Sequence, residues 1–298
     1  MAKASDFEGK KPEELFYFVD YSPEEAERIG YSNYSYWGSV IQNFLKQKVA
    51  VFCLILFLAL TVFSFIALGI GKYHYTTLIS DSSKAFIRPN AEYWFGTDNL
   101  GRDYWCQVWY ATQVSIRLAL VVAVGESIVG VIFGLIWGYV RSLDRFFTEL
   151  YNLIDNVPYI IYMTLIALMV GQSFWIMAIS MIAINWLSMA RRVRNMVFMF
   201  RDREYNLASR CLGTPLWRVL TKNILPYLVS VIILRMALSI PGTINTPSLG
   251  LILSKVRGFF LDYPYLLVFP ASIVSIISIS FYIMGNALSD AADPRNHV

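Results

Sequence analysis

The chain has 298 residues, 56% of them hydrophobic, and a mean hydropathy of +0.49. A water-soluble domain cannot bury that much apolar surface, so the composition excludes an ordinary soluble protein and indicates one that spans a membrane. The net charge of +4 is too small to favour a nucleic-acid partner.

The N-terminal segment, residues 1–48, is mostly polar, and we expect it to be cytoplasmic and to carry no cleavable signal peptide. Near its end apolar side chains recur at helical spacing and predict an amphipathic helix ahead of the first span. These residues are Trp37, Val40, Ile41, Phe44 and Leu45. The helix would lie in the inner membrane interface or dock on its own protein.

Six apolar runs are long enough for transmembrane helices. The expected spans are 49–71, 113–140, 150–170, 172–189, 224–241 and 266–288. The 189–223 loop carries eight basic and two acidic side chains, which predicts that it is cytoplasmic, with both termini inside and the 72–112 loop outside. We therefore divide the rest of the chain into a first span with its outer loop (49–112), a core bundle (113–288) that includes a polar segment (201–223), and a tail (289–298).

The outer loop carries a polar motif just ahead of the second span. Its candidate site residues are Gly96, Thr97, Asp98, Gly101, Arg102 and Asp103. The glycines permit tight turns, and the charged residues can tie the loop together by charge-assisted hydrogen bonds. The motif would either hold the mouth of a pathway in shape or contact a substrate.

The second span carries a glycine at every fourth position, at Gly130, Gly134 and Gly138, which predicts close packing against another helix. Glu126 lies in the same span. A carboxylate at membrane depth is costly, so Glu126 would line a translocation path or pair with a neighbouring span.

Two more charged residues lie at membrane depth, Asp155 in the third span and Arg235 in the fifth. Pro158 should kink the third span close to Asp155. Arg235 would pair with a carboxylate or reach the outer surface by snorkelling. Its position towards the outside favours Glu126 as the partner, which leaves Asp155 to face water in a pathway.

The sixth span has polar side chains on roughly one face, which would pack against another helix or form a polar wall of a pathway. They are Ser272, Ser275, Ser278 and Tyr282.

The sequence predicts no metal site and no enzyme activity in this chain. Its cysteines, Cys53, Cys106 and Cys211, are dispersed and odd in number, which predicts free thiols. His74 and His297 are isolated from any metal-like spacing. There is no glycine-rich phosphate loop, so the chain should not hydrolyse ATP by itself.

The polar segment between the fourth and fifth spans has the signals of two short helices. Asp202 can cap the first, which should stop at Gly213, because glycine best takes the left-handed conformation after a helix. Thr214 and Pro215 suit the N-cap and first position of the second helix, which passes into the next span at Pro226. A rigid helix–turn–helix between spans suits the transmission of force from a soluble partner.

This segment resembles the coupling loop of bacterial ABC importer permeases, in which an acidic-Ala-Ala triplet is followed by Gly and then by Leu-Pro. The matching residues are Ala208, Ser209, Gly213, Leu225 and Pro226, and Leu207 stands where the family usually has Glu. The resemblance implies a set of residues that couple the chain to an ATPase. These are Glu204, Leu207, Ala208, Ser209, Cys211, Leu212, Gly213, Thr214 and Pro215.

Other parts of the chain resemble the oligopeptide and dipeptide branch of these permeases. The matches are the 95–103 motif continued by Ser115 and Arg117, the Asp155 and Pro158 pair, Ser248-Leu249-Gly250, Phe269-Pro270 and the tail at 290–295.

The resemblance implies an all-α integral membrane fold, with six transmembrane helices in a type I importer bundle and cytoplasmic coupling helices. The implied function is a permease subunit that forms half of an oligopeptide pathway in a bacterial cell membrane. The implied partners are a homologous permease, two cytoplasmic ATP-binding subunits and an extracellular peptide-binding protein. ATP and magnesium would bind to the ATPases, and this chain would need no cofactor.

An alternative function is also open. A secondary transporter or a channel subunit could use Glu126, Asp155 and Arg235 as intramembrane charges.

Overall fold

A computed structural model describes residues 36–71, 80–201, 204, 211–215, 218 and 248–292. The chain divides into two units, Met1–Gly38 and Ser39–Val298. Within the described residues the regular elements are helices, and nearly all of them belong to the second unit. They are α3 (Tyr36–Lys46), α4 (Lys48–Ile70), the short 3-10 helix η3 (Ser82–Lys84), α5 (Tyr104–Tyr139), α6 (Arg141–Asp155), α7 (Tyr159–Met169), α8 (Phe174–Arg201), α12 (Leu249–Val256) and α13 (Tyr265–Ala292).

Four of the described helices are long and apolar enough to cross a membrane. They are Lys48–Ile70, Tyr104–Tyr139, Phe174–Met199 and Tyr265–Ala291. They correspond to the first, second, fourth and sixth expected spans, although α5 begins before residue 113 and α8 continues beyond residue 189. The fifth expected span, 224–241, lies outside the described residues.

The third expected span, 150–170, is bent at Pro158 as predicted, but the helix is interrupted there rather than only kinked. The structure has two helices instead, α6 and α7, which meet at an angle of 75°. Pro158 has no N–H to donate and disfavours a helical conformation at Val157, so α6 ends at Asp155 and α7 begins only at Tyr159. The composition changes at the same point, because α6 is amphipathic with no fully buried residue, whereas α7 is almost entirely apolar.

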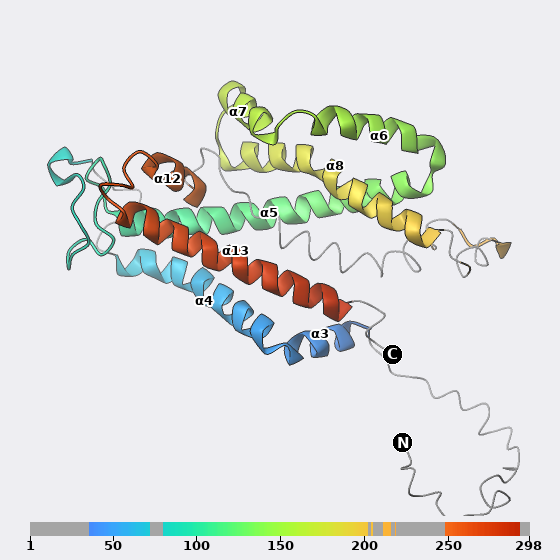
Figure 1. Cartoon of the computed structure of the whole chain (residues 1–298), viewed down its shortest axis with the longest axis horizontal. Helices are drawn as coiled ribbons and strands as arrows, with labels where there is room; N and C mark the ends of the chain where they lie inside the picture. The colour runs from blue at the N-terminus through green and yellow to red at the C-terminus, as the bar shows by residue number, and fades with distance from the viewer. Residues whose placement is uncertain are drawn as a thin grey trace, which may run out of the picture. The chain divides into compact units, whose positions relative to one another are not determined.

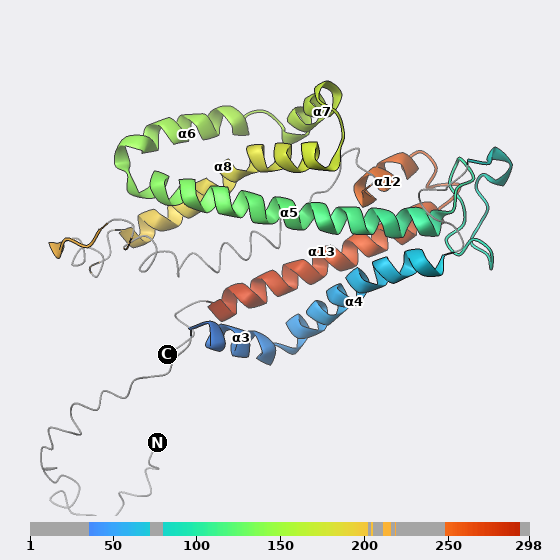
Figure 2. The ribbon, with the colours of Figure 1, turned by 180° about the vertical axis from the view of Figure 1, so that it is seen from behind.

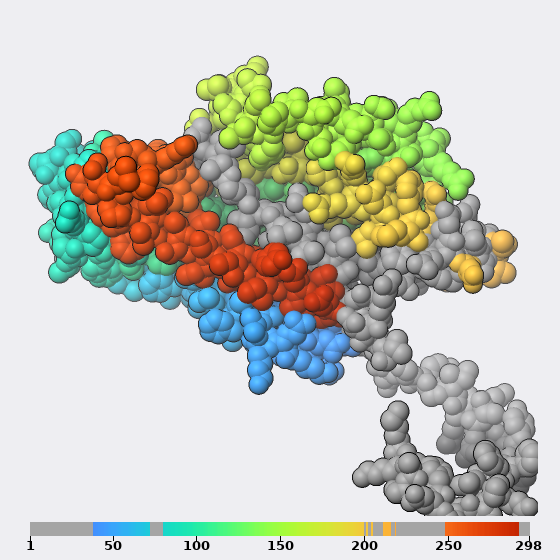
Figure 3. Space-filling view, in the orientation of Figure 1, coloured from blue at the N-terminus to red at the C-terminus, as the bar shows by residue number. Residues whose placement is uncertain are grey.

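The helices of the second unit form two packed pairs, in which α5 lies along α8 and α4 lies along α13 (Figure 1 and Figure 2). α5 also contacts α4, α12 and α13, so it belongs to both pairs. On the face drawn in Figure 3, α12 and α13 form one continuous surface, and α6 and α7 form another.

The contact between α5 and α8 depends on the predicted glycines. A Cβ atom on Gly134 would lie 2.6 Å from the Ala190 carbonyl oxygen and 2.6 Å from Val193 Cβ. A Cβ atom on Gly130, one turn before Gly134, would overlap Met189. A Cβ atom on Gly138, one turn after Gly134, would overlap Val197. The predicted packing role of the three glycines is therefore confirmed, because any larger residue would push the two helices apart.

Side chains at the Tyr104 end of α5 hold α4 and α13. The Trp105 indole donates a hydrogen bond to the Ala67 carbonyl at 2.9 Å, and the Gln113 amide donates to the Ser64 carbonyl at 2.9 Å. The Tyr104 hydroxyl donates to the Leu266 carbonyl at 2.6 Å. These polar contacts fix the depth of α4 and α13 against α5, which apolar packing alone leaves less specific.

We expect Gly134→Ala to lower the free energy of unfolding by about 1–3 kcal/mol, because the added methyl group overpacks the contact of α5 with α8. Gly69→Ala in α4 is a matched control, since a Cβ atom there has no neighbour within 4 Å. The control should leave stability unchanged or raise it by up to about 1 kcal/mol through helix propensity. Thermal unfolding of the two purified variants in detergent measures both effects, and equal midpoints would contradict the packing role.

Candidate functional site

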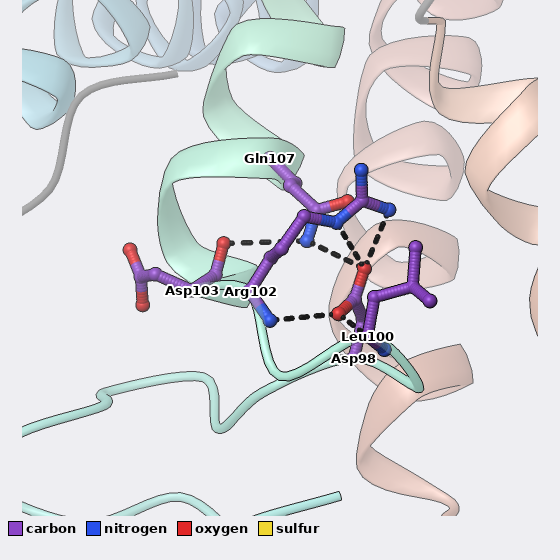
Figure 4. A network of polar contacts seen from close by, with 5 residues as sticks. All are labelled: Asp98, Leu100, Arg102, Asp103 and Gln107. Atoms are coloured by element: carbon purple, nitrogen blue, oxygen red, sulfur yellow. Dashed lines mark hydrogen bonds and ion pairs between the residues drawn. The ribbon is translucent and has the colours of Figure 1, made fainter. Parts of the chain in front are cut away.

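The 80–103 loop is organised around the Asp98 carboxylate, which is nearly buried (Figure 4). Its Oδ1 atom accepts hydrogen bonds from the backbone N–H groups of Leu100 and Arg102, at 2.9 and 2.8 Å. Its Oδ2 atom accepts from Arg102 Nε at 2.9 Å, from Arg102 Nη2 at 2.8 Å and from Gln107 Nε2 at 3.1 Å. Five donors therefore satisfy this carboxylate from within the chain, and the arrangement favours a role in holding the loop rather than in contacting a substrate.

Thr97 and the two glycines complete the turns of the loop. The Thr97 hydroxyl donates to the Lys84 carbonyl at 2.6 Å and accepts from the Ile87 N–H at 2.8 Å. Gly96 and Gly101 have φ of +76° and +74°, and a Cβ atom at either would overlap a backbone carbonyl oxygen. Only glycine fits these two positions. The Tyr265 hydroxyl donates to the Thr97 carbonyl at 2.9 Å, which ties the loop to the start of α13.

Asp103 caps the N-terminus of α5, where its carboxylate accepts a hydrogen bond from the Cys106 N–H at 3.1 Å. Burial raises the pKa of the Asp103 carboxyl, in spite of hydrogen bonds from the Cys106 and Trp105 backbone that act to lower it. The motif thus contains two carboxylates in different settings, since Asp98 is paired with a cation and Asp103 is a buried helix cap.

A cavity of about 140 Å³ lies at the break between α6 and α7. Asp155, Pro158, Tyr159, Tyr162, Asn185 and Ser188 are among the residues that line it. Glu126 of α5 is fully buried and close enough to the Tyr159 hydroxyl for an electrostatic interaction. The break therefore brings two of the predicted pathway residues, Asp155 and Pro158, together with polar groups from α8.

The sequence analysis missed Tyr159 and Asn185 at this break. Both residues line the cavity, Tyr159 from the start of α7 and Asn185 from α8. Asn185 could have been found from the sequence, because it is an amide within an expected membrane span and such a group requires a partner there.

The other predicted pathway residues lie elsewhere. Ser272, Ser275 and Tyr282 are exposed on α13. Arg235 lies outside the described residues, so its predicted pairing with Glu126 stays a prediction.

The predicted coupling segment is described in part. Gly213 has a φ of +73°, which confirms the expected left-handed conformation, and Leu212 beside it is 85% exposed. The Arg218 N–H donates to the Pro215 carbonyl at 2.9 Å, as in the first turn of a new helix. Cys211 is a free, exposed thiol, and Glu204 is exposed and helical. Leu207, Ala208 and Ser209 lie outside the described residues.

Two segments that resembled the same family are joined in the structure. The Ser115 hydroxyl of α5 accepts a hydrogen bond from the Leu249 N–H at 3.0 Å. Ser248 caps α12 by accepting from the Leu251 N–H at 3.4 Å. The 248–250 motif thus begins a short helix whose first N–H groups are bonded by two serines.

This helical architecture, with a braced loop before α5 and a glycine-capped segment after α8, is that of a binding-protein-dependent membrane permease. Residues 130–298 match the family described as "Binding-protein-dependent transport system inner membrane component". Residues 35–89 match "N-terminal TM domain of oligopeptide transport permease C". The chain belongs to this family: it is an ABC transporter permease and a multi-pass inner-membrane protein.

Named relatives extend the match to nearly the whole chain. The chain is 35% identical to "Oligopeptide transport system permease protein AmiD" of Streptococcus pneumoniae, over 95% of this chain and 98% of that protein. It is 29% identical to "Oligopeptide transport system permease protein OppC" of Bacillus subtilis, over 95% and 98% of the two chains. It is 27% identical to "Dipeptide transport system permease protein DppC" of the same organism, over 95% and 93%.

We expect the two carboxylates of the loop to respond differently to amidation. Asp98→Asn removes the charge that Arg102 pairs with and should lower the free energy of unfolding by about 1.5–3 kcal/mol. Asp103→Asn should be tolerated, because asparagine caps a helix as well as aspartate does, whereas Asp103→Ala loses the cap and about 1 kcal/mol.

The effect of Asp103→Asn should also depend on pH. The raised pKa means that the folded chain holds this proton more tightly than the unfolded chain, so the charged form costs stability as pH rises above the usual 3.8. Asp103→Asn removes this cost, so the stability of the variant relative to wild type should increase as pH rises above about 4. Thermal midpoints of wild type and both amide variants test this, and equal losses from Asp98→Asn and Asp103→Asn would contradict it.

Proposed function

We propose that this chain is the permease subunit of an ATP-driven importer of oligopeptides, in which it forms half of the translocation pathway. The observation that carries the proposal is the exposed, glycine-capped turn at Gly213, which follows the long helix α8. The names of the relatives support peptides as the substrate class. A second, homologous permease would supply the other half of the pathway.

The coupling segment would work by transmitting the closure of a cytoplasmic ATPase to the helices. Leu212 is exposed beside Gly213, as expected for a segment that docks in a groove of another protein. ATP binding would close two ATPase subunits and move the docked segments, and the bundle would change from an inward-open to an outward-open form by rigid-body motion. ATP and magnesium belong to those subunits in this mechanism.

The 80–103 loop would face the extracellular peptide-binding protein. Its braced form keeps the Tyr104 end of α5 fixed to α13 through Tyr265 and Thr97. A rigid outer surface suits a docking protein that delivers peptide, because a preformed surface costs little conformational entropy on binding.

The orientation follows from the basic residues around the Arg201 end of α8, which we propose to be cytoplasmic. In a variant without native cysteines, Lys84→Cys should react with a membrane-impermeant maleimide in intact cells, because Lys84 is exposed in the proposed outer loop. Arg192→Cys, also at an exposed position, should react only after the membrane is permeabilised. The reverse labelling pattern would contradict the orientation.

The function is tested with the assembled transporter in liposomes. The wild-type chain should co-purify with two ATPases and a second permease, and should support peptide uptake that depends on ATP. Gly213→Val should keep the chain in the membrane but abolish most uptake, because a β-branched residue at positive φ is strained by about 1–2 kcal/mol and changes the docking turn.

Gly258→Val serves as the matched control. A Cβ atom at Gly258 also meets open space, as it does at Gly213, but the backbone there is not left-handed. Normal uptake by Gly213→Val, or an equal loss in the control, would remove the coupling role of this turn. Absence of ATPases from the purified wild-type complex would refute the proposed function itself.

A further inference from the structure

Three helices meet at the carboxylate of Asp144 in α6. Arg194 Nε of α8 donates a hydrogen bond to Asp144 Oδ1 at 2.6 Å, and Trp137 Nε1 of α5 donates to the same oxygen at 2.9 Å. The Arg194 guanidinium also lies over the Trp137 ring, 5.4 Å from its centroid, and over the Phe198 ring, 4.2 Å from its centroid. We call Trp137, Asp144 and Arg194 the Asp144 clamp.

The neighbouring arginines of α8 hold the same stretch of the helix. Arg191 lies over the Tyr151 ring of α6, 4.2 Å from its centroid. Arg201 Nη1 donates a hydrogen bond to the Gly138 carbonyl of α5 at 3.1 Å. The sequence analysis assigned these basic residues to topology alone, but three of them also bind the last turns of α8 to α5 and α6.

The attachment of α6 depends strongly on these polar contacts, because the helix has no fully buried residue. Its apolar contribution comes from partly buried side chains around the buried Trp137, Leu187 and Ala190. Those side chains are Phe147, Leu150, Tyr151 and Ile154. A helix held by half-buried side chains can slide, whereas a planar guanidinium that is both hydrogen-bonded and stacked fixes its position.

The environment of the clamp makes the ion pair stronger than one on an open surface. The side chains of Arg194 and Asp144 are 18% and 33% exposed. Partial burial lowers the local dielectric constant, and the stacked rings reduce the freedom of the guanidinium, so less entropy is lost when the pair forms.

The clamp lies between two parts of the proposed mechanism. On one side, α8 ends at Arg201, just before the segment that contains Glu204 and Gly213. On the other side, α6 runs from the clamp to Asp155, where the break and its cavity begin. α6 is therefore a single rigid element between the end of α8 and the break.

We propose that Asp144 is a positioning residue for coupling. Through Arg194 it makes α6 move together with the end of α8, so a displacement of the coupling segment reaches the break between α6 and α7. This role rests on the proposed function, and it assigns the break as the point where the pathway responds to the ATPase.

The test uses the assembled transporter in liposomes with its peptide-binding protein and peptide. Asp144→Asn removes the charge but keeps an oxygen that can accept from Trp137. We expect normal assembly and normal basal ATP hydrolysis, with peptide uptake and the peptide stimulation of ATP hydrolysis lowered about tenfold, in line with a lost charge-assisted contact. Asp144→Glu should restore part of the stimulation.

Two further variants separate coupling from simple stability. Arg192→Gln is the matched control, since Arg192 is an exposed arginine on the same part of α8, and it should behave as wild type. Asp144→Asn combined with Arg194→Gln should be no worse than the poorer single variant, because both remove the same contact.

Several results would overturn the role of Asp144. These are unchanged uptake in Asp144→Asn, loss of assembly in that variant, an equal loss in Arg192→Gln, or strictly additive losses in the double variant. If ATP hydrolysis by the wild-type complex does not respond to peptide, the proposed function itself is overturned. If the wild-type complex responds and only the Asp144 variants depart from expectation, the role of Asp144 alone is overturned.

Discussion

The close approach of α5 and α8 is the constraint on which the rest of the structure depends. Three glycines of α5 lie against Met189, Ala190, Val193 and Val197 of α8 with no space for a Cβ atom. Lipid tails are as apolar as leucine, so helices in a membrane associate through close packing rather than through hydrophobic burial. Because α5 also contacts α4, α12 and α13, the position of each of these helices is set relative to the α5–α8 pair.

Each end of α5 joins this framework to a different polar assembly. At the Tyr104 end, Asp103 caps the helix and Asp98 braces the 80–103 loop that precedes it. At the Tyr139 end, Trp137 is part of the Asp144 clamp, which also contains Arg194 of α8. The Gly138 carbonyl beside it accepts a hydrogen bond from Arg201 of α8. In the proposed importer these assemblies face opposite sides of the membrane. The rigid helix α5 between them would hold the outer loop at a fixed position relative to the coupling segment.

The sequence predicted the features that depend on local chemistry or on composition. Glycine spacing predicted the α5–α8 contact, and the turn signal at Gly213 predicted its left-handed conformation, because only glycine adopts these geometries at low cost. The 75° break was underestimated as a kink, since the angle at Pro158 depends on which helices pack on either side. Asp144 was missed because its role depends on contacts with Trp137 and Arg194. These two residues lie on two other helices, α5 and α8, and the sequence alone does not show that they meet Asp144.

The division of the third segment into α6 and α7 has a consequence for the bilayer around the protein. With 15 and 11 residues, the two helices are about 22 Å and about 16 Å long, so neither alone crosses a hydrocarbon core of about 30 Å. The backbone stays hydrogen-bonded through the break, because the Asn156 N–H donates to the Asn152 carbonyl at 3.1 Å and the Val157 N–H donates to the Ile154 carbonyl at 3.3 Å. At this side of the permease, the bilayer can therefore be crossed only by α6 and α7 together. By contrast, α4 is long enough to cross alone, and its apolar outer surface, with Phe52, Ile55 and Val62 exposed, is suited to lipid contact.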